Sequence, residues 1–341
     1  MKKLAAIAAA VGLALFSLTG CAQSGVKTSA EATPENPMVL TLAHGLSETH
    51  TVHIAMTEFA EKVKERTDGR IQIQIFPNGQ LGSENENMEQ LMSGVISMTK
   101  VSAPGLATYN ESYHAFGLPY IFDSTEDFYH VMDSSQMHDF FLSSENDGFV
   151  TLTYYTSGAR SFYTKNKAIR KPEDLKGLKI RTMTNNLHVE YFTALGAIPT
   201  PMSFSELFTA LQQKTVDGQE NPPALIYNNA LYEAQKYMSV SEHVFTAVAL
   251  NISSDFYNGL PEDYQAAIKE AAENTMEYQR ELITEENESL LSEIEASGVE
   301  VTVLTDDQKA AFQKVAEDTV YKTAAGAYGQ ELIDMAADHN K

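Results

Sequence analysis

Cysteine and tryptophan are nearly missing from this chain: its 341 residues include one cysteine and no tryptophan. A single cysteine excludes an intramolecular disulfide framework and a metal site made of thiolates alone. Basic residues are also scarce, since 24 of them stand against 46 acidic ones and give a formal net charge of −22. Nucleic-acid-binding proteins carry a basic face, so we expect no nucleic-acid partner. The hydrophobic content of 43% is that of a globular protein, and the length suggests two domains.

Long hydrophobic runs are absent beyond the first 20 residues, which have the pattern of a signal peptide. Lys2 and Lys3 precede a nearly uniform apolar stretch, 4–18, that is too short to span a membrane comfortably. The stretch ends in Leu-Thr-Gly-Cys, which resembles the bacterial lipobox, with Cys21 as the lipidated residue. The alternative is an ordinary secretory signal. We therefore predict a signal peptide over 1–20 and a lipid-anchored protein outside the cytoplasmic membrane, on the periplasmic side if there is an outer membrane.

Residues 21–37 are rich in Ser, Thr, Glu and Pro and have no apolar periodicity, so we expect a flexible linker there. After it, apolar alternation predicts short strands, and apolar residues at spacings of three and four predict helices between them. This βαβαβ rhythm is typical of a mostly parallel sheet covered by helices. The predicted strands are 39–42, 71–75, 98–101, 149–155, 178–182, 244–250 and 299–303, and a final helix begins after the capping residues 305–308.

The segment 261–297 contains no glycine and no interior proline, and Gly298 follows it. As a single helix it would be about 55 Å long, which is longer than a small domain is wide. We expect this helix to bridge both halves of the molecule.

Basic residues gather in one window of this acidic chain, with seven of them between 165 and 181. Most of the lysines there are expected to lie on a solvated edge. Arg181 differs, because it leaves an apolar strand at the carboxyl end, where open α/β sheets bind ligands. Its planar guanidinium suits a carboxylate. Arg160 follows Gly158 at another predicted strand end, and its alternative role is a salt bridge between the two halves.

Motifs of nucleotide-binding, zinc-protease and serine-hydrolase sites are absent, so we expect no enzyme, no cofactor and no metal. His44, His50 and His53 are close in sequence, but helix capping and hydrogen bonding explain them without a metal. Glu84 and Glu86 could be taken for a catalytic pair of carboxylates. However, Ser83 and Glu86 form a capping-box pattern, which explains one of these acids structurally.

Four motifs together resemble the DctP-type solute-binding proteins of TRAP transporters. They occur in that family's order, and the resemblance extends over roughly 39–330: FPNGQLGSE (76–84), LPYIF (118–122), DLKGLKIR (174–181) and VDGQENP (216–222). The resemblance implies a two-lobed, periplasmic-binding-protein-like α/β fold with mixed sheets flanked by helices and a long bridging helix. We assign 38–157 plus 246–285 to lobe I and 158–245 plus 286–341 to lobe II. The resemblance also implies that the two lobes close on an organic acid by hinge motion and that a membrane permease is the partner protein.

The resemblance further implies a role for individual residues. Arg181 matches the arginine that pairs with the ligand carboxylate, and Arg160 matches an auxiliary arginine beside it. Asn221 matches an asparagine that hydrogen-bonds the acid group, and Phe204 an aromatic residue against the ligand.

The remaining predicted site residues would contact the part of the ligand beyond its carboxylate. Glu84, Lys100 and Ser102 lie where family members vary. Thr184 replaces an asparagine of the sialic-acid binders, which argues against sialic acid. Among the histidines of 44–53 we select His44, because it directly follows the first strand.

The segments 98–102, 152–155, 158–164 and 221–223 resemble the uronate-binding branch, whose ligands are glucuronate and galacturonate. Such a ligand needs one clamped carboxylate and several partners for its hydroxyls. A C4-dicarboxylate or another small organic acid is the alternative, and Lys100 could then serve as a second cationic clamp. A receptor of the same fold that serves a sensor protein also remains open.

Arg181→Lys tests the carboxylate clamp. The variant keeps the charge but loses the bidentate fork. We expect ligand affinity, measured by calorimetric titration, to fall by about tenfold or more, or roughly 1.4 kcal/mol, with folding intact. Unchanged affinity would remove Arg181 from the site.

Overall fold

The computed structural model describes residues 32–325 and 330–339. The predicted signal peptide and Cys21 lie outside these ranges. Residues 32–37, the last part of the predicted linker, form a turn in which Thr33 pairs with Asn36 and the Ala32 side chain is buried. The predicted linker therefore extends too far, because its end packs on the body of the protein. None of the helices in the described ranges is long and apolar enough to cross a membrane.

Within the described residues, nine strands form one mixed sheet in the order β2-β1-β3-β8-β4-β7-β5-β6, and β9 pairs with β8. β1 is parallel to β2 and β3, β5 is parallel to β6 and β7, and β8 is parallel to β9. β8 runs antiparallel to β3 and β4, and β4 antiparallel to β7. The strands are β1 (Met38–Ala43), β2 (Ile71–Phe76), β3 (Met98–Ser102), β4 (Phe149–Thr164), β5 (Lys179–Thr182), β6 (Ile198–Pro201), β7 (Gly218–Asn221), β8 (Tyr237–Ser253) and β9 (Glu300–Val303).

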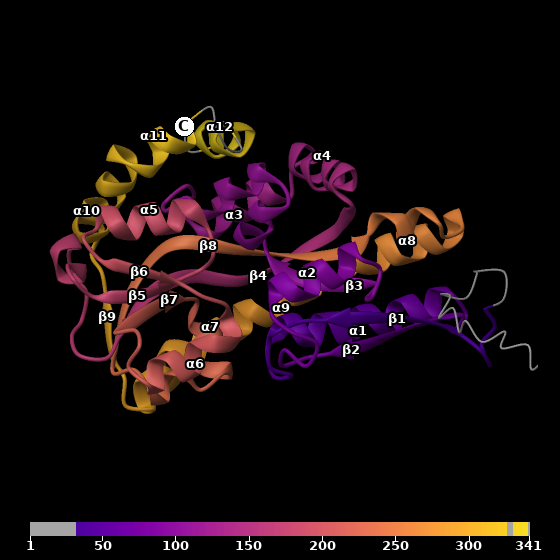
Figure 1. The fold of residues 1–341 in the computed structure, drawn as a ribbon, viewed down its shortest axis with the longest axis horizontal. Coiled ribbons are helices and arrows are strands. Elements are labelled where there is room, and N and C mark those ends of the chain that lie inside the picture. The colour runs from indigo at the N-terminus through magenta and orange to yellow at the C-terminus, as the bar shows by residue number, and fades with distance from the viewer. Residues whose placement is uncertain (1–31, 326–329, 340–341) are drawn as a thin grey trace, which may run out of the picture.

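β4 and β8 are the longest strands, with 16 and 17 residues, and they run side by side through the middle of the molecule (Figure 1). β1, β2 and β3 lie at one end of this pair, and β5, β6, β7 and β9 at the other. The pair holds together the two lobes expected of this architecture.

The sequence prediction ended the β4 strand too early, at Tyr155. The strand continues through Gly158 with a φ of 88° and a shift of register between Thr156 and Ala159. A β-bulge of this kind adds residues to one strand without ending the ladder. Arg160 therefore lies inside a strand rather than at a strand end.

Helices cover both faces of the sheet (Figure 1). The α-helix that begins at Asp306 was expected to be the last, but two more follow it in the described residues. The α-helices are α1 (Thr51–Arg66), α2 (Glu84–Met92), α3 (Thr125–Met132), α4 (Ser135–Ser143), α5 (Asn186–Ala194), α6 (Phe204–Gln212), α7 (Pro223–Asn228), α8 (Ser254–Asn258), α9 (Glu262–Ala296), α10 (Asp306–Asp318), α11 (Val320–Ala324) and α12 (Gln330–His339).

α9 has 35 residues, which confirms the long helix predicted over 261–297. Its first half buries Ile268 and Ala271 in a core shared with α1, β1 and β2. Its second half buries Ile283 and Leu290 in a different core, shared with α6, α7 and β8. A single helix thus contributes to two hydrophobic cores, one near each end of the sheet.

The predicted lobe boundaries, 157/158 and 245/246, fall on the register shift between β4 and β8. Thr156 pairs with Ala247 on one side of the shift, and Ala159 pairs with Phe245 on the other. The ladder is interrupted there, and it is interrupted again between Thr151 and Thr153 and between Arg160 and Phe162. Strands bend locally at such irregularities. The division into two sets of residues stays a prediction.

Gly218 begins β7, where three strands meet, and leaves no space for a side chain. A Cβ atom there would overlap the carbonyl oxygen of Tyr163 and lie 3.1 Å from Ile180 Cδ1. We expect Gly218→Ala to lower the free energy of unfolding in urea by about 2 kcal/mol or more. Gly45→Ala is the control, because nothing lies within 4 Å of its Cβ position, and its effect should stay within about 0.5 kcal/mol. Equal stability of the two variants would contradict this account.

Candidate functional site

A cleft of about 740 Å³, partly open to solvent, lies against the middle of the sheet. Its walls come from β3, β4, β5 and β7 and from the first turns of α2 and α6. Eight of the residues selected from the sequence line it: Glu84, Lys100, Ser102, Arg160, Arg181, Thr184, Phe204 and Asn221.

Arg181 brings a buried positive charge to the cleft. It lies on β5 and is 3% exposed, and its Nε and Nη2 atoms donate to the carbonyl oxygen of Met202 at 3.1 and 2.8 Å. Burial and then the nearby Arg160 lower its pKa to about 10, so it stays charged at neutral pH. Within the described part of the chain, no carboxylate forms an ion pair with Arg181. The neutral carbonyl of Met202 does not compensate the positive charge of Arg181, so this side chain is suited to bind an anion.

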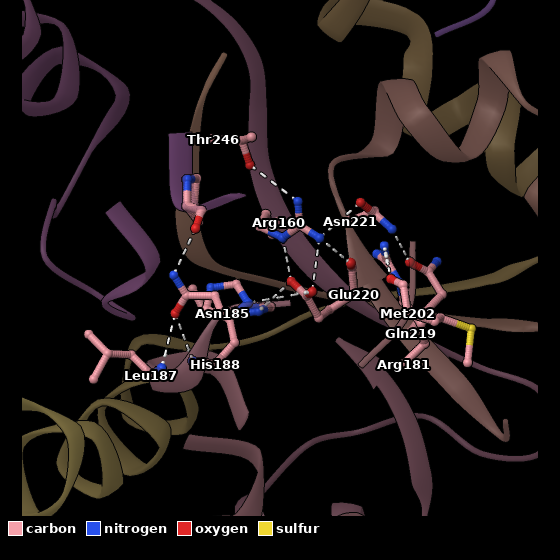
Figure 2. A network of polar contacts seen from close by, with 12 residues as sticks. Arg160, Arg181, Asn185, Leu187, His188, Met202, Gln219, Glu220, Asn221 and Thr246 are labelled. Carbon is pink, nitrogen blue, oxygen red and sulfur yellow. Dashed lines mark hydrogen bonds and ion pairs between the residues drawn. The ribbon is translucent and has the colours of Figure 1, made fainter. Parts of the chain in front are cut away.

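Arg160, on β4, is held differently. Its Nε and Nη2 atoms both donate to the carboxylate of Glu220 on β7, and Nη2 also donates to Asn221 Oδ1 at 2.9 Å. Figure 2 shows the guanidinium between Glu220, Asn221 and Thr246, whose Oγ1 accepts from Nη1 at 3.5 Å. Arg160 lines the cleft and also forms a salt bridge that joins the neighbouring strands β4 and β7. Both partners lie in the same predicted lobe, 158–245, so this is not the salt bridge between the two halves that was considered for Arg160.

Glu220 is a site residue that sequence reasoning missed. It is fully buried, and burial alone would raise the pKa of its carboxyl. The Arg160 guanidinium, together with hydrogen bonding from His243, instead holds this pKa well below its usual range. His243 Nε2 lies 3.3 Å from Glu220 Oε2, and His188 Nδ1 lies 4.0 Å from Oε1. The only signal in the sequence was its place beside Asn221 in the segment 216–222.

Lys100 and Glu84 form a second ion pair, on the other wall of the cleft. Lys100 Nζ donates to Glu84 Oε1 at 2.5 Å, and the amide and hydroxyl of Ser102 each donate to the same carboxylate at 3.2 Å. Burial favours the neutral acid, but the Lys100 charge and these hydrogen bonds lower the pKa of Glu84. Glu84 is the first residue of α2, where the helix dipole also favours a negative charge. Lys100 is therefore already neutralised.

The three other lining residues selected from the sequence differ in how tightly they are held. Asn221 is 2% exposed, and it accepts from Arg160 and donates to Gln219 Oε1. Phe204 begins α6 and packs against both cores that α9 enters. Thr184 is exposed at the cleft and follows β5.

His44 does not line the cleft, although the next residues, Gly45 and Leu46, do. The amide of Leu46 donates to its Nδ1 at 3.1 Å, and its Nε2 lies 3.0 Å from His53 Nδ1. Burial, followed by the charge of Lys100, lowers its pKa to about 2. With both ring nitrogens occupied, His44 supports the wall of the cleft from behind. No cluster of three metal-ligating side chains occurs among the residues described.

The charged residues around the cleft form two ion pairs and leave one arginine without an acidic partner among the described residues. Arg160 is balanced by Glu220, and Lys100 is balanced by Glu84. Arg181 alone is left over, so the charged lining residues together with Glu220 behind them carry one net positive charge. The opposite wall of the cleft offers both hydrogen-bond donors and acceptors. They are the carboxylate of Glu84, the ammonium of Lys100 and the hydroxyl of Ser102. This arrangement suits a molecule with one carboxylate and several hydroxyls.

The sequence profile of the bacterial extracellular solute-binding proteins, family 7 (DctP), matches residues 42–326. A curated relative, the C4-dicarboxylate-binding periplasmic protein DctP of Rhodobacter capsulatus, is 29% identical over 324 residues, which cover 94% of this chain and 96% of the relative.

Two solved structures have the same fold over most of both chains. The sugar acid binding protein DctPAm of Advenella mimigardefordensis, in complex with galactonate, has a TM-score of 0.85 at 29% identity and covers 89% of this chain and 98% of its own. A TRAP periplasmic solute-binding protein of Sulfitobacter sp. NAS-14.1, with bound β-D-galacturonate, has a TM-score of 0.82 at 32% identity, with coverages of 87% and 98%.

Three buried histidines make stability depend on pH. Burial lowers the pKa of His44 to about 2 and those of His50 and His188 to about 3, so the folded protein keeps all three neutral at pH 5. The unfolded chain binds protons there below pH 6.5, so stability is full above this value and falls as pH decreases.

We expect the free energy of unfolding in urea to fall by about 3 kcal/mol between pH 6 and pH 5. His188→Gln should remove about a third of this change, because one proton fewer is taken up. A free energy that is flat over this interval would show that these histidines are protonated in the folded state.

Proposed function

The chain belongs to family 7 of the bacterial extracellular solute-binding proteins, and we propose that it binds a sugar acid, D-galacturonate or D-glucuronate. In this proposal it is the extracytoplasmic receptor of a TRAP transporter and passes the acid to the membrane permease. Cys21 would carry the lipid that keeps it at the membrane.

The observation that carries the proposal is the single unbalanced guanidinium in the cleft. Arg181 has no acidic partner among the described residues, whereas Arg160 and Lys100 each have one at close range. A ligand with one carboxylate completes this set of charges. A second carboxylate would meet the occupied Lys100 and the negative Glu84, and would have to separate them.

The lining residues offer a partner for each part of a uronate. The fork of Arg181 would take the carboxylate, with Arg160 and Asn221 beside it. Glu84, Lys100 and Ser102 would bind hydroxyls, since together they can both donate and accept. Phe204 would lie against the apolar face of the sugar ring. Closure of the lobes would follow from the higher affinity of the closed form for the ligand.

The alternative ligand is a C4-dicarboxylate, which is what the Rhodobacter capsulatus relative binds according to its name. Among the described residues, Lys100 is the only cation besides the two arginines that lines the cleft. It could act as the second clamp if Glu84 moved away. The loss of a hydrogen-bonded ion pair then counts against this ligand.

A thermal-shift screen against galacturonate, glucuronate, succinate and sialic acid tests the proposal. A ligand at 100 times its dissociation constant adds about 2.7 kcal/mol to stability, which is a clear rise in Tm. We expect a rise with one or both uronates and none with succinate. A rise with succinate alone would keep the receptor function but overturn the sugar-acid class.

Glu84→Gln tests whether the Glu84–Lys100 ion pair determines selectivity between ligands with one and with two carboxylates. The variant frees Lys100, so a dicarboxylate gains an ion pair while a uronate loses a charged acceptor for its hydroxyls. We expect the ratio of galacturonate to succinate affinity, measured by calorimetry, to shift toward succinate by about tenfold. The control is Glu86→Gln, two residues further along α2 and outside the cleft lining. An unchanged ratio in Glu84→Gln would mean that the Glu84–Lys100 pair does not set selectivity.

A further inference from the structure

The long helix α9 contacts three consecutive residues of β4, Tyr154 to Thr156. They lie just before the register shift between Thr156 and Ala159. These contacts are polar and come from one stretch of the helix, 275–280. Thr275 Oγ1 lies 3.0 Å from the Tyr155 hydroxyl, Arg280 Nη2 donates to the Tyr154 hydroxyl at 2.7 Å, and Gln279 contacts Thr156.

Gln279 makes the most specific of these contacts, because its side-chain amide bonds to backbone. Its Oε1 accepts from the Thr156 amide at 3.0 Å, and its Nε2 donates to the Thr156 carbonyl at 2.8 Å. Nε2 also donates to Thr51 Oγ1, at the start of α1, at 3.1 Å. The side chain is 1% exposed. It thus supplies to Thr156 the pair of hydrogen bonds that a neighbouring strand would supply.

Thr156 connects this contact to the cleft. Its hydroxyl donates to the Thr246 carbonyl on β8 at 3.3 Å and accepts from the Gly158 amide at 3.0 Å. Thr246 in turn provides the Oγ1 that accepts from Nη1 of Arg160, which is seen in Figure 2. A hydrogen-bonded path therefore runs from the middle of α9 to a guanidinium that lines the binding cleft.

Beyond Arg280, the described residues of α9 form no further hydrogen bond with β4. The next turns of α9 line a second cavity of about 970 Å³ behind the sheet, together with Ala159 and Ser161 of β4. Since side chains alternate along a strand, Arg160 faces the binding cleft while its two neighbours face this rear cavity. Thr156, which Gln279 contacts, is therefore the last residue of β4 before the bulge that α9 holds through hydrogen bonds.

We propose that Gln279 is a positioning residue for ligand binding: it fixes the bulge of β4 to α9 and thereby sets the position of Arg160 and the relative orientation of the two ends of the sheet. The proposal goes beyond the choice of ligand. It rests on the proposed function only where acid binding is the readout.

Two variants remove hydrogen bonds from different parts of the path between α9 and Arg160. Gln279→Met keeps the length of the side chain and removes its hydrogen bonds to Thr156 and Thr51. Thr246→Val removes only the hydroxyl that contacts Arg160 and keeps the backbone carbonyl, so it tests the same path if Gln279→Met does not fold. Thr275→Val is the matched control, because it removes a buried hydroxyl contact on the same face of α9, one turn earlier.

The first measurement is calorimetric titration with D-galacturonate, alongside unfolding in urea. We expect Gln279→Met and Thr246→Val to weaken binding about fivefold, and Thr275→Val to leave it within about twofold at a similar loss of stability. Affinities that follow stability in all three variants would reduce Gln279 to a structural residue and overturn the proposal.

The second measurement needs no ligand. In the Cys21→Ala protein, which has no native thiol, spin labels at the exposed positions Val95→Cys and Val303→Cys report the distance between the two ends of the sheet. We expect Gln279→Met to broaden or shift this distance by about 2 Å or more, and Thr275→Val to leave it unchanged.

The two readouts separate the two ideas. If the unaltered protein does not bind galacturonate, the sugar-acid assignment fails and the spin-label distances alone decide on Gln279. An unchanged distance distribution in Gln279→Met would overturn the positioning role, whichever acid binds.

Discussion

The antiparallel pairing of β4 with β8 is the constraint on which the site depends. Lys100 and Ser102 are placed by the pairing of β3 with β8 on one side. Asn221 is placed by the pairing of β7 with β4 on the other, and Arg181 is one strand further along. The three cationic residues of the cleft, Lys100, Arg160 and Arg181, thus have their positions defined through these two strands and the strands paired with them. A change in their register would move the two ion pairs and the free guanidinium relative to one another.

Because these charged residues are buried, each of their charges has to be compensated by a nearby opposite charge. An ion removed from water must be compensated, and an unpaired one raises the free energy of the folded state. The chain meets this requirement for Arg160 with Glu220 and for Lys100 with Glu84, and leaves Arg181 with only the carbonyl of Met202. An anionic ligand then relieves an electrostatic deficit that the fold itself creates. In the proposed function, selectivity for the number of carboxylates would follow from the same pairing of charges.

Periodicity and local chemistry made part of this structure predictable. The absence of glycine and interior proline over 261–297 predicted α9 almost to the residue, and Arg181 was selected because it leaves an apolar strand at its carboxyl end. The full length of β4 was missed, because a bulge between Thr156 and Ala159 interrupts the strand without ending it. Glu220 and Gln279 could not be found from local pattern, since their partners lie 60 and 123 residues away in the chain. Buried polar contacts of this range exist only once the sheet has formed.

The free edge of β6 has a further consequence. Ile198 and Met202 direct their amides inward, to the carbonyls of Leu178 and Thr182, so the amides of the residues between them alternate across the strand. The positions that face outward, 199 and 201, are both proline and have no N–H to offer. An incoming strand would find acceptors there but no donors. The sheet is thereby chemically terminated at this end, which protects the protein against edge-to-edge aggregation.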